Sequence, residues 1–235
     1  MLFHRRRRER PLVELVREEV EWYWRARLGR LGGIYLAFSS LLAAASSIFV
    51  IYILLQPLVE YRGFTLSGFI SSLRYSLYIV NNPARYPVLD SLSVVSTFIY
   101  LFALITLSLS VLGVIGVFKE WRSWVAFVPA STGSASLLVS LLYSLLRVYV
   151  RDVIPSIPYT ITVEAAGGRV YLEPPSTTYT WIYWLAWRPQ YFFVAFNLLI
   201  ALSAGSLVIL ILKPKPPVTL KNMKKKKLHQ KGGEE

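Results

Sequence analysis

Four stretches without a charged side chain constrain this chain more than any other feature of its sequence. Asp, Glu, Lys and Arg are absent between Arg30 and Glu60, between Asp90 and Lys119, between Arg122 and Arg147, and between Arg188 and Lys213. These windows contain 29, 28, 24 and 24 residues, and about 20 apolar residues suffice for a helix to cross about 30 Å of hydrocarbon. The sequence therefore predicts four transmembrane helices, near residues 33–55, 94–118, 124–146 and 190–212.

The overall composition agrees with this prediction. Of the 235 residues, 54% are hydrophobic and 17% are charged, whereas soluble proteins have about 25% charged residues. We therefore expect an all-α membrane protein that folds as a four-helix transmembrane bundle. Residues 33–212 would form the transmembrane domain, and residues 58–93 and 147–189 would form its two outer loops.

The residue types present limit the chemistry that the chain can perform. There is no cysteine, and the two histidines, His4 and His229, lie in polar terminal segments. A disulfide, a thiolate nucleophile, a cysteine-ligated metal and a bis-histidine haem site inside the chain are therefore excluded. Neither a glycine-rich phosphate loop nor a zinc-protease motif occurs in the sequence. We predict no catalytic residue, no metal site and no cofactor.

The basic residues indicate the orientation of the helices. If both termini are cytoplasmic, the inner segments 1–32, 119–122 and 213–235 contain 19 Lys and Arg residues, and the two outer loops contain 7. Lys and Arg near the ends of transmembrane helices remain on the cytoplasmic side, and an even number of spans places both ends of the chain on one side. The sequence thus predicts a multi-pass protein of the cell membrane with cytoplasmic termini.

Both terminal segments are predicted to contact the inner membrane surface. Residues 11–28 combine apolar residues at helical spacing with charges on the opposite side, which predicts an amphipathic helix at the interface or, alternatively, a helix docked on a partner protein. Residues 213–235 are expected to be disordered. Nucleic acid is a less favoured partner than anionic lipid, because the basic clusters lie beside the membrane. The residues of these clusters are Arg5, Arg6, Arg7, Arg8, Lys224, Lys225, Lys226 and Lys227.

The two outer loops have different patterns. Residues 66–80 place apolar side chains such as Leu66, Ile70 and Leu77 at helical spacing, which predicts a short surface helix or a re-entrant segment. In the second loop, residues 159–173 contain two β-prone segments around a pair of glycines, which predicts a small outer β-hairpin.

The seven tryptophans are predicted to lie near the two membrane surfaces. They are Trp22, Trp24, Trp121 and Trp124 at the inner ends of spans, and Trp181, Trp184 and Trp187 before the fourth span. Because tryptophan prefers the headgroup region, we interpret them as an anchoring girdle. A platform for a ligand or a partner is the alternative.

Small and polar residues within the predicted spans are the candidate functional residues. Ser136, Ser140 and Ser144 share one helical face of the third span, and the fourth span contains Asn197, Ala201 and Gly205 at the same spacing. Such residues allow helices to pack closely, and this is the interpretation that we favour. Lining of a polar conduit is the alternative, since hydroxyl groups can line a path for neutral solutes.

These patterns together favour a protein with interaction surfaces and little reactive chemistry. The predicted spans contain no titratable acid or base, whereas proton pumps and voltage sensors require ionisable groups in the membrane. We expect a non-enzymatic structural or assembly subunit of a membrane complex, which forms a homo-oligomer or binds other membrane subunits. A pore or carrier for a neutral small solute is the alternative. An enzyme that uses the outer carboxylates is the third possibility.

Overall fold

The structure is a computed structural model, and it describes residues 12–119, 122–160, 164–165, 168–169 and 175–212. Side chains are described within 31–119, 124–157 and 175–211. The segment Leu36–Leu207 forms one compact unit, and the described residues outside it belong to a second unit. The chain is mostly helical and contains a small antiparallel sheet.

The first helix, α1 (Leu12–Leu55), is an uninterrupted element of 44 residues. Its start next to Pro11 confirms the predicted helix start, but the expected end near residue 28 is wrong. Gly32 and Gly33 do not break the helix, because the residues on both sides are good helix formers and glycine is common within membrane helices. The predicted interfacial helix and the first span are thus one helix. The amphipathic face itself depends on side chains outside the described set.

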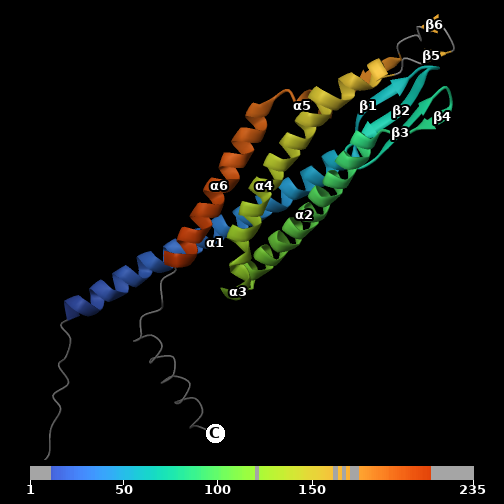
Figure 1. Cartoon of the computed structure of the whole chain (residues 1–235). Helices are drawn as coiled ribbons and strands as arrows, with labels where there is room; N and C mark the ends of the chain where they lie inside the picture. The colour runs from blue at the N-terminus through green and yellow to red at the C-terminus, as the bar shows by residue number, and fades with distance from the viewer. Residues whose placement is uncertain (1–11, 120–121, 161–163, 166–167, 170–174, 213–235) are drawn as a thin grey trace, which may run out of the picture. The chain divides into compact units, whose positions relative to one another are not determined.

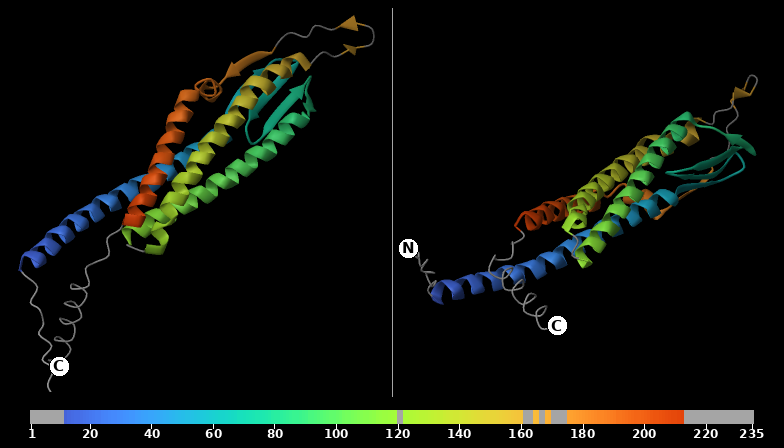
Figure 2. Two further views of the ribbon diagram at one scale, coloured as in Figure 1. Left: turned by 60° about the vertical axis from the view of Figure 1, so that its left-hand side comes forward. Right: turned by 90° about the horizontal axis from the view of Figure 1, so that it is seen from below.

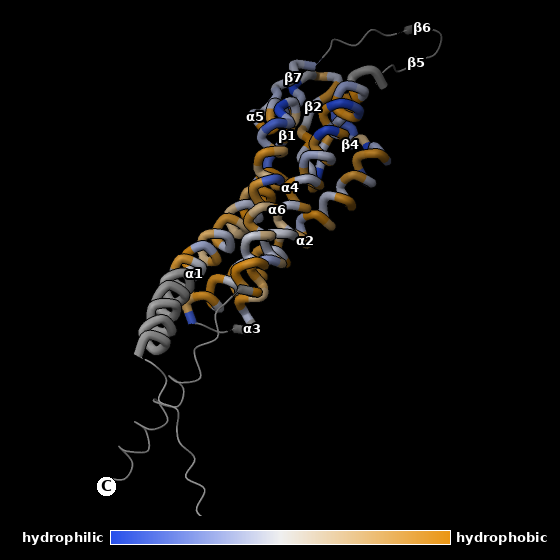
Figure 3. Tube along the Cα trace, turned by 90° about the vertical axis from the view of Figure 1, so that its left-hand side faces the viewer, coloured by the Kyte–Doolittle hydropathy of each residue, from blue (hydrophilic) through white to orange (hydrophobic). Residues whose placement is uncertain are grey.

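Three described helices are long and apolar enough to cross a membrane. They are residues Leu31–Leu55 of α1, helix α2 (Pro87–Phe118), and residues Pro189–Ile211 of α6 (Pro189–Leu212). Figure 3 shows hydrophobic residues along α2 and α6 and hydrophilic residues gathered around the sheet. Helix α2 begins at Pro87 rather than near residue 94, so the first outer loop is shorter than predicted.

Helix α4 (Phe127–Val148) lies where the third span was predicted, but it is not one of these three candidate spans. Eleven of its 22 residues are buried inside the molecule, whereas 17% of the apolar window of α6 is buried. A helix that is enclosed by its neighbours can contain many hydroxyl groups, because these groups need not face lipid. Of the four transmembrane helices predicted for the bundle, three are therefore supported among the described helices.

Residues 57–84 form strands rather than the predicted surface helix. Strands β1 (Pro57–Arg62), β2 (Leu66–Ser71), β3 (Tyr75–Ile79) and β4 (Asn82–Ala84) are joined by β7 (Ser176–Tyr179) in the antiparallel order β4-β3-β2-β1-β7. The helical prediction failed because apolar residues four apart in sequence also lie on one face of a strand. Leu66 and Ile70 are both fully buried on β2.

Strand β7 is distant in sequence from its partner, β1. Glu60 pairs with Thr178 and Tyr61 with Thr177, so the second outer loop completes the sheet that the first outer loop begins. Figure 1 shows this sheet at the end of the Leu36–Leu207 unit where α2 begins. Both views in Figure 2 agree on this arrangement. The two outer loops therefore fold together as one small structure.

The turn between β3 and β4 contains a strained valine. Val80 has φ 47 and Asn81 has φ 65, and Ile79 pairs with Asn82 across them, as in a two-residue hairpin with both central residues at positive φ. A β-branched residue is disfavoured at positive φ. We expect Val80→Gly to raise the free energy of unfolding by about 1 kcal/mol, measurable as a higher Tm in detergent. An unchanged or lower Tm would show that the backbone at Val80 is not strained.

The predicted outer β-hairpin is confirmed next to its glycines. Strand β5 (Glu164–Ala165) pairs with β6 (Gly168–Arg169) in antiparallel register. The predicted start of the first strand at Tyr159 is wrong, because residues Ile154–Thr160 form a 3₁₀ segment, η2. Residues 161–163, 166–167 and 170–174 lie outside the described residues.

Two buried tyrosines attach the sheet to the end of α4. Beyond α4 the chain continues as a π-helical turn, η1 (Tyr149–Val153), into η2. The hydroxyl group of Tyr149 donates to the carbonyl oxygen of Ser72 at 3.1 Å, and that of Tyr61 donates to the carbonyl oxygen of Ile154 at 3.4 Å. Burial raises the pKa of Tyr149 to about 12 and raises that of Tyr61 as well. Both groups are therefore neutral hydrogen-bond donors at physiological pH.

Candidate functional site

The three serines of the predicted α4 stripe do not share one environment. Ser136 is buried and donates to the carbonyl oxygen of Gly133 at 2.7 Å. Ser140 and Ser144 are exposed, and the hydroxyl group of Ser144 donates to the carbonyl oxygen of Ser140 at 3.0 Å. Each donated bond stays within the helix. The three serines were predicted to share one helical face, but in the structure one of them is buried and two are exposed.

The buried polar face of α4 consists mainly of other residues. Ser131, Thr132 and Ala135 are fully buried. The hydroxyl group of Ser203 in α6 donates to the carbonyl oxygen of Pro129 at 2.9 Å. The sequence reasoning missed Ser203, although a hydroxyl residue inside an otherwise apolar span is the signal that could have found it. Within the Leu36–Leu207 unit, α4 and α6 thus share a polar contact.

Aromatic packing provides a second contact between these two helices. The rings of Tyr143 and Phe192 lie 5.0 Å apart between centroids. Residue 129 of α4 contacts residue 203 of α6, and residue 143 contacts residue 192, so the two helices run antiparallel. Antiparallel packing is the arrangement expected of consecutive spans.

The candidate residues of α6 differ in burial. Asn197 and Ala201 are exposed, and Gly205 is partly buried. The amide nitrogen of Asn197 donates to the carbonyl oxygen of Phe193 at 2.8 Å, one turn earlier in the same helix. Asn197 therefore makes no hydrogen bond to another helix among the described contacts.

The basic clusters at residues 5–8 and 224–227 lie outside the described residues.

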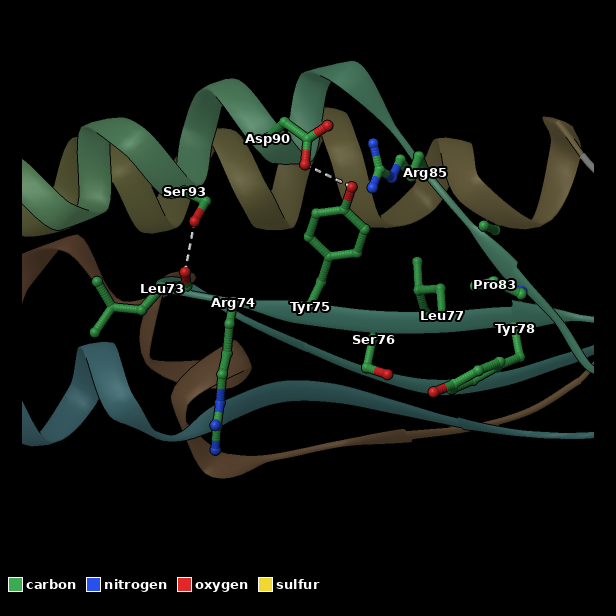
Figure 4. A pocket seen from close by; sticks show the side chains of 11 residues that line it. Leu73, Arg74, Tyr75, Ser76, Leu77, Tyr78, Pro83, Arg85, Asp90 and Ser93 are labelled. Atoms are coloured by element: carbon green, nitrogen blue, oxygen red, sulfur yellow. Dashed lines mark hydrogen bonds between the residues drawn. The ribbon is translucent and has the colours of Figure 1, made fainter.

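A pocket of about 420 Å³ lies between β3, β4 and the start of α2 (Figure 4). The hydroxyl group of Tyr75 donates to the Asp90 carboxylate at 2.7 Å and accepts from the backbone N–H of Tyr86 at 3.1 Å. Arg85 lies beside this pair in Figure 4. Ser93 donates to the carbonyl oxygen of Leu73.

These contacts fix the first turn of α2 on the sheet. Burial raises the pKa of the Tyr75 hydroxyl group, and its bond to Asp90 raises it further. The sequence reasoning considered Asp90 only as an outer carboxylate. It did not identify Tyr75 as the partner of Asp90, because residues 66–80 were predicted to be helical, whereas Tyr75 lies on strand β3. Within the described residues, no group of three His, Asp or Glu side chains is arranged to hold a metal ion.

An aromatic cluster lies where β7 leads into α5 (Trp181–Leu185). Tyr179 lies 4.2 Å from Tyr183 between ring centroids, and the ring of Trp184 contacts both tyrosines edge-on. Thr180 donates to the carbonyl oxygen of Pro57 at 2.8 Å, which fixes this cluster against β1. Three tryptophans remain largely exposed: Trp181, Trp184 and Trp187. The arrangement suits both the predicted girdle and an aromatic platform.

Comparison of this chain with protein-family models, with curated proteins and with solved structures finds no match.

Proposed function

We propose that this chain is a non-enzymatic structural subunit of an integral membrane assembly. The observation that supports this best is the exposed surface of α6. The helix is apolar enough to cross a membrane, yet its exposed surface contains the amide of Asn197. A surface that faces lipid alone gains nothing from an amide group, whereas a surface that faces another helix gains a hydrogen bond.

The proposed topology has four spans in the cell membrane, with α4 as the third. The 22 residues of α4 extend about 33 Å at 1.5 Å per residue, enough to cross the hydrocarbon region. In this arrangement half of the residues of α4 are buried inside the molecule, the sheet lies outside the cell, and both termini are cytoplasmic. The excess of basic residues in the inner segments supports this orientation.

An assembly role accounts for the structure better than a conduit does. Ser140 and Ser144 are exposed and Ser136 is buried, so the three hydroxyl groups do not share one surface that could line a path. The pocket beside α2 is lined by Tyr75 and Asp90, whose hydrogen bonds attach the helix to the sheet. Such contacts give a rigid outer surface, which suits binding of another subunit.

Native mass spectrometry after purification in mild detergent tests this proposal. We expect an assembly heavier than the 26.8 kDa of one chain, either as a multiple of that mass or with additional subunits. A homogeneous monomer would contradict the proposal. Flux of a neutral solute into liposomes, lost when Ser136 and Ser140 are both changed to leucine, would instead establish the carrier alternative.

A further inference from the structure

We infer that the pocket between β3, β4 and the start of α2 binds a phosphoethanolamine group, which is a phosphate joined to a primary ammonium by an ethylene bridge. This group occurs as the headgroup of a membrane phospholipid and as a free soluble compound. The inference goes beyond the assembly role proposed above, and it requires only that α2 crosses a membrane. The shape of the pocket, its two opposite charges and the apolar surface next to it support the inference.

The pocket lies beside the part of β3 that β4 does not cover. Residues Tyr75–Ile79 of β3 all pair with β2, whereas β4 pairs with Leu77, Tyr78 and Ile79. Tyr75 and Ser76, which lie beyond the end of β4, both line the pocket. Its volume of about 420 Å³ is within the range of about 300–1,000 Å³ that is usual for small-molecule sites. A small polar group can therefore enter beside β3.

Two side chains of opposite charge line the pocket where α2 begins. The Asp90 carboxylate accepts a hydrogen bond from the hydroxyl group of Tyr75 at 2.7 Å, and a carboxylate has about four acceptor positions. Arg85 lies beside this pair in Figure 4, and it makes no ion pair with any residue that the structure describes. Both Arg85 and Asp90 are exposed. The pocket therefore offers one positive and one negative group to a ligand.

A ligand that contains both charges fits this pair better than a ligand with one charge. A phosphate binds a guanidinium through charge-assisted hydrogen bonds, but a phosphate alone would be repelled by Asp90. A primary ammonium donates N–H bonds to a carboxylate, but an amine alone would be repelled by Arg85. The choline group has no N–H donor and is recognised by aromatic cages instead. Asp90 therefore favours ethanolamine over choline.

An exposed apolar face of α2 continues from the pocket. Val94, Phe98, Leu101 and Ile105 follow Asp90 by 4, 8, 11 and 15 residues, a spacing that places them on the same helix face, and all four are exposed. The helix is apolar enough to cross a membrane, and its rise per residue puts Phe98 about 12 Å beyond Asp90. A phospholipid with its headgroup in the pocket can thus lay an acyl chain along this face. This continuity favours the lipid over the free compound as the source of the group.

Lipid binding to the full chain tests the site. Native mass spectrometry in mild detergent would follow the binding of added dioleoyl phosphatidylethanolamine and, separately, of dioleoyl phosphatidylcholine. We expect the ethanolamine lipid to bind about tenfold more tightly, because only its ammonium donates to Asp90. Equal affinities, or a preference for the choline lipid, would overturn the inference. This comparison uses the unaltered chain, so it does not depend on how a variant folds.

Asp90→Asn should abolish the preference between the two lipids. The asparagine carbonyl oxygen can still accept the bond from Tyr75, so the attachment of α2 to the sheet is retained. Asp152→Asn is the matched control and should keep the preference, because Asp152 is an exposed carboxylate outside the pocket. Loss of the preference in Asp152→Asn, or its retention in Asp90→Asn, would overturn the inference.

The two arginines of the pocket lining test the phosphate contact. Arg85→Gln should weaken the binding of both lipids about tenfold, since both contain a phosphate. Arg74→Gln is its control: Arg74 also lines the pocket, but its guanidinium lies 5.8 Å from the centroid of the Phe69 ring and points away from Asp90 in Figure 4. Equal weakening in the two variants would overturn the assignment of the phosphate to Arg85.

Competition by free phosphoethanolamine distinguishes the two sources of the group. We expect it to displace the lipid only at concentrations about a hundredfold higher than a competing lipid, because it has no acyl chain to cover the α2 face. Displacement at equal concentrations would assign the site to the soluble compound. A monomeric chain that prefers the ethanolamine lipid would refute the assembly role and support this site. An assembly that binds the two lipids equally would leave the assembly role standing and refute this site.

Discussion

Replacing Gly68 by alanine is expected to destabilise the outer sheet by about 4 kcal/mol, the largest effect of any single change considered for this chain. Gly68 lies in the middle of β2 with φ 128, a conformation that side chains rarely adopt. A Cβ atom at this position would lie 1.9 Å from the carbonyl oxygen of Ser76 on β3. Neither backbone can move without breaking the pairing of Gly68 with Leu77.

Two measurements follow this loss of structure. The Tm in detergent should fall by roughly 8 to 16 °C. Trypsin should cleave faster at Arg62, Arg74 and Arg85, which are exposed residues within or beside the strands. Gly33→Ala is the control, because nothing lies within 4 Å of a Cβ atom built there. If the two variants behaved alike, the described register of β2 and β3 would be wrong.

The second large effect is expected where Gly116 of α2 contacts α3 (Arg122–Val125). A Cβ atom on Gly116 would lie 2.7 Å from the backbone carbonyl carbon of Trp124 and 2.8 Å from the backbone nitrogen of Val125. Because both neighbours are backbone atoms, the helices themselves must separate to admit a methyl group. We expect Gly116→Ala to lower the free energy of unfolding by about 2 kcal/mol and the Tm by roughly 4 to 8 °C.

Gly133→Ala in α4 is the matched control for this prediction. There the nearest atom, the hydroxyl oxygen of Ser203, lies 3.4 Å from the added Cβ atom, an ordinary contact. Alanine has a higher helix propensity than glycine, by up to about 1 kcal/mol, so this variant should be neutral or slightly stabilised. Opposite signs for the two substitutions support the close approach at Gly116, and stabilisation of both would refute it.

The first outer loop illustrates where prediction from the sequence failed. Residues 66–80 were predicted to form a short surface helix or a re-entrant segment, whereas they form strands and Leu66, Ile70 and Leu77 are in the core. Their spacing did not distinguish a helix from a strand. The strands of this segment pair with each other and with β1 and β4, and β7 joins the far side of β1 from a distant part of the chain. Apolar spacing alone contains no information about this pairing.

The candidate residues of α6 remain a prediction. The sequence predicted helix packing, or alternatively a conduit, at Asn197 and Ala201, because polar and small side chains are unusual within an apolar span. It could not identify which surface they face. That depends on the position of α6 beside α4, which the contacts Tyr143–Phe192 and Ser203–Pro129 establish.

By itself, the sequence determined the apolar helices, the pairing of β5 with β6 beside a glycine and the excess of basic residues in the predicted inner segments. These features depend on local composition, because a helix satisfies its own backbone hydrogen bonds and needs only length and hydrophobicity to suit a membrane. The tertiary structure alone decided that β7 joins the strands of residues 57–84, that half of the residues of α4 are buried, and that Asn197 is exposed. Strand pairing and burial require contacts between residues that are distant in the chain, so they are properties of the packed molecule.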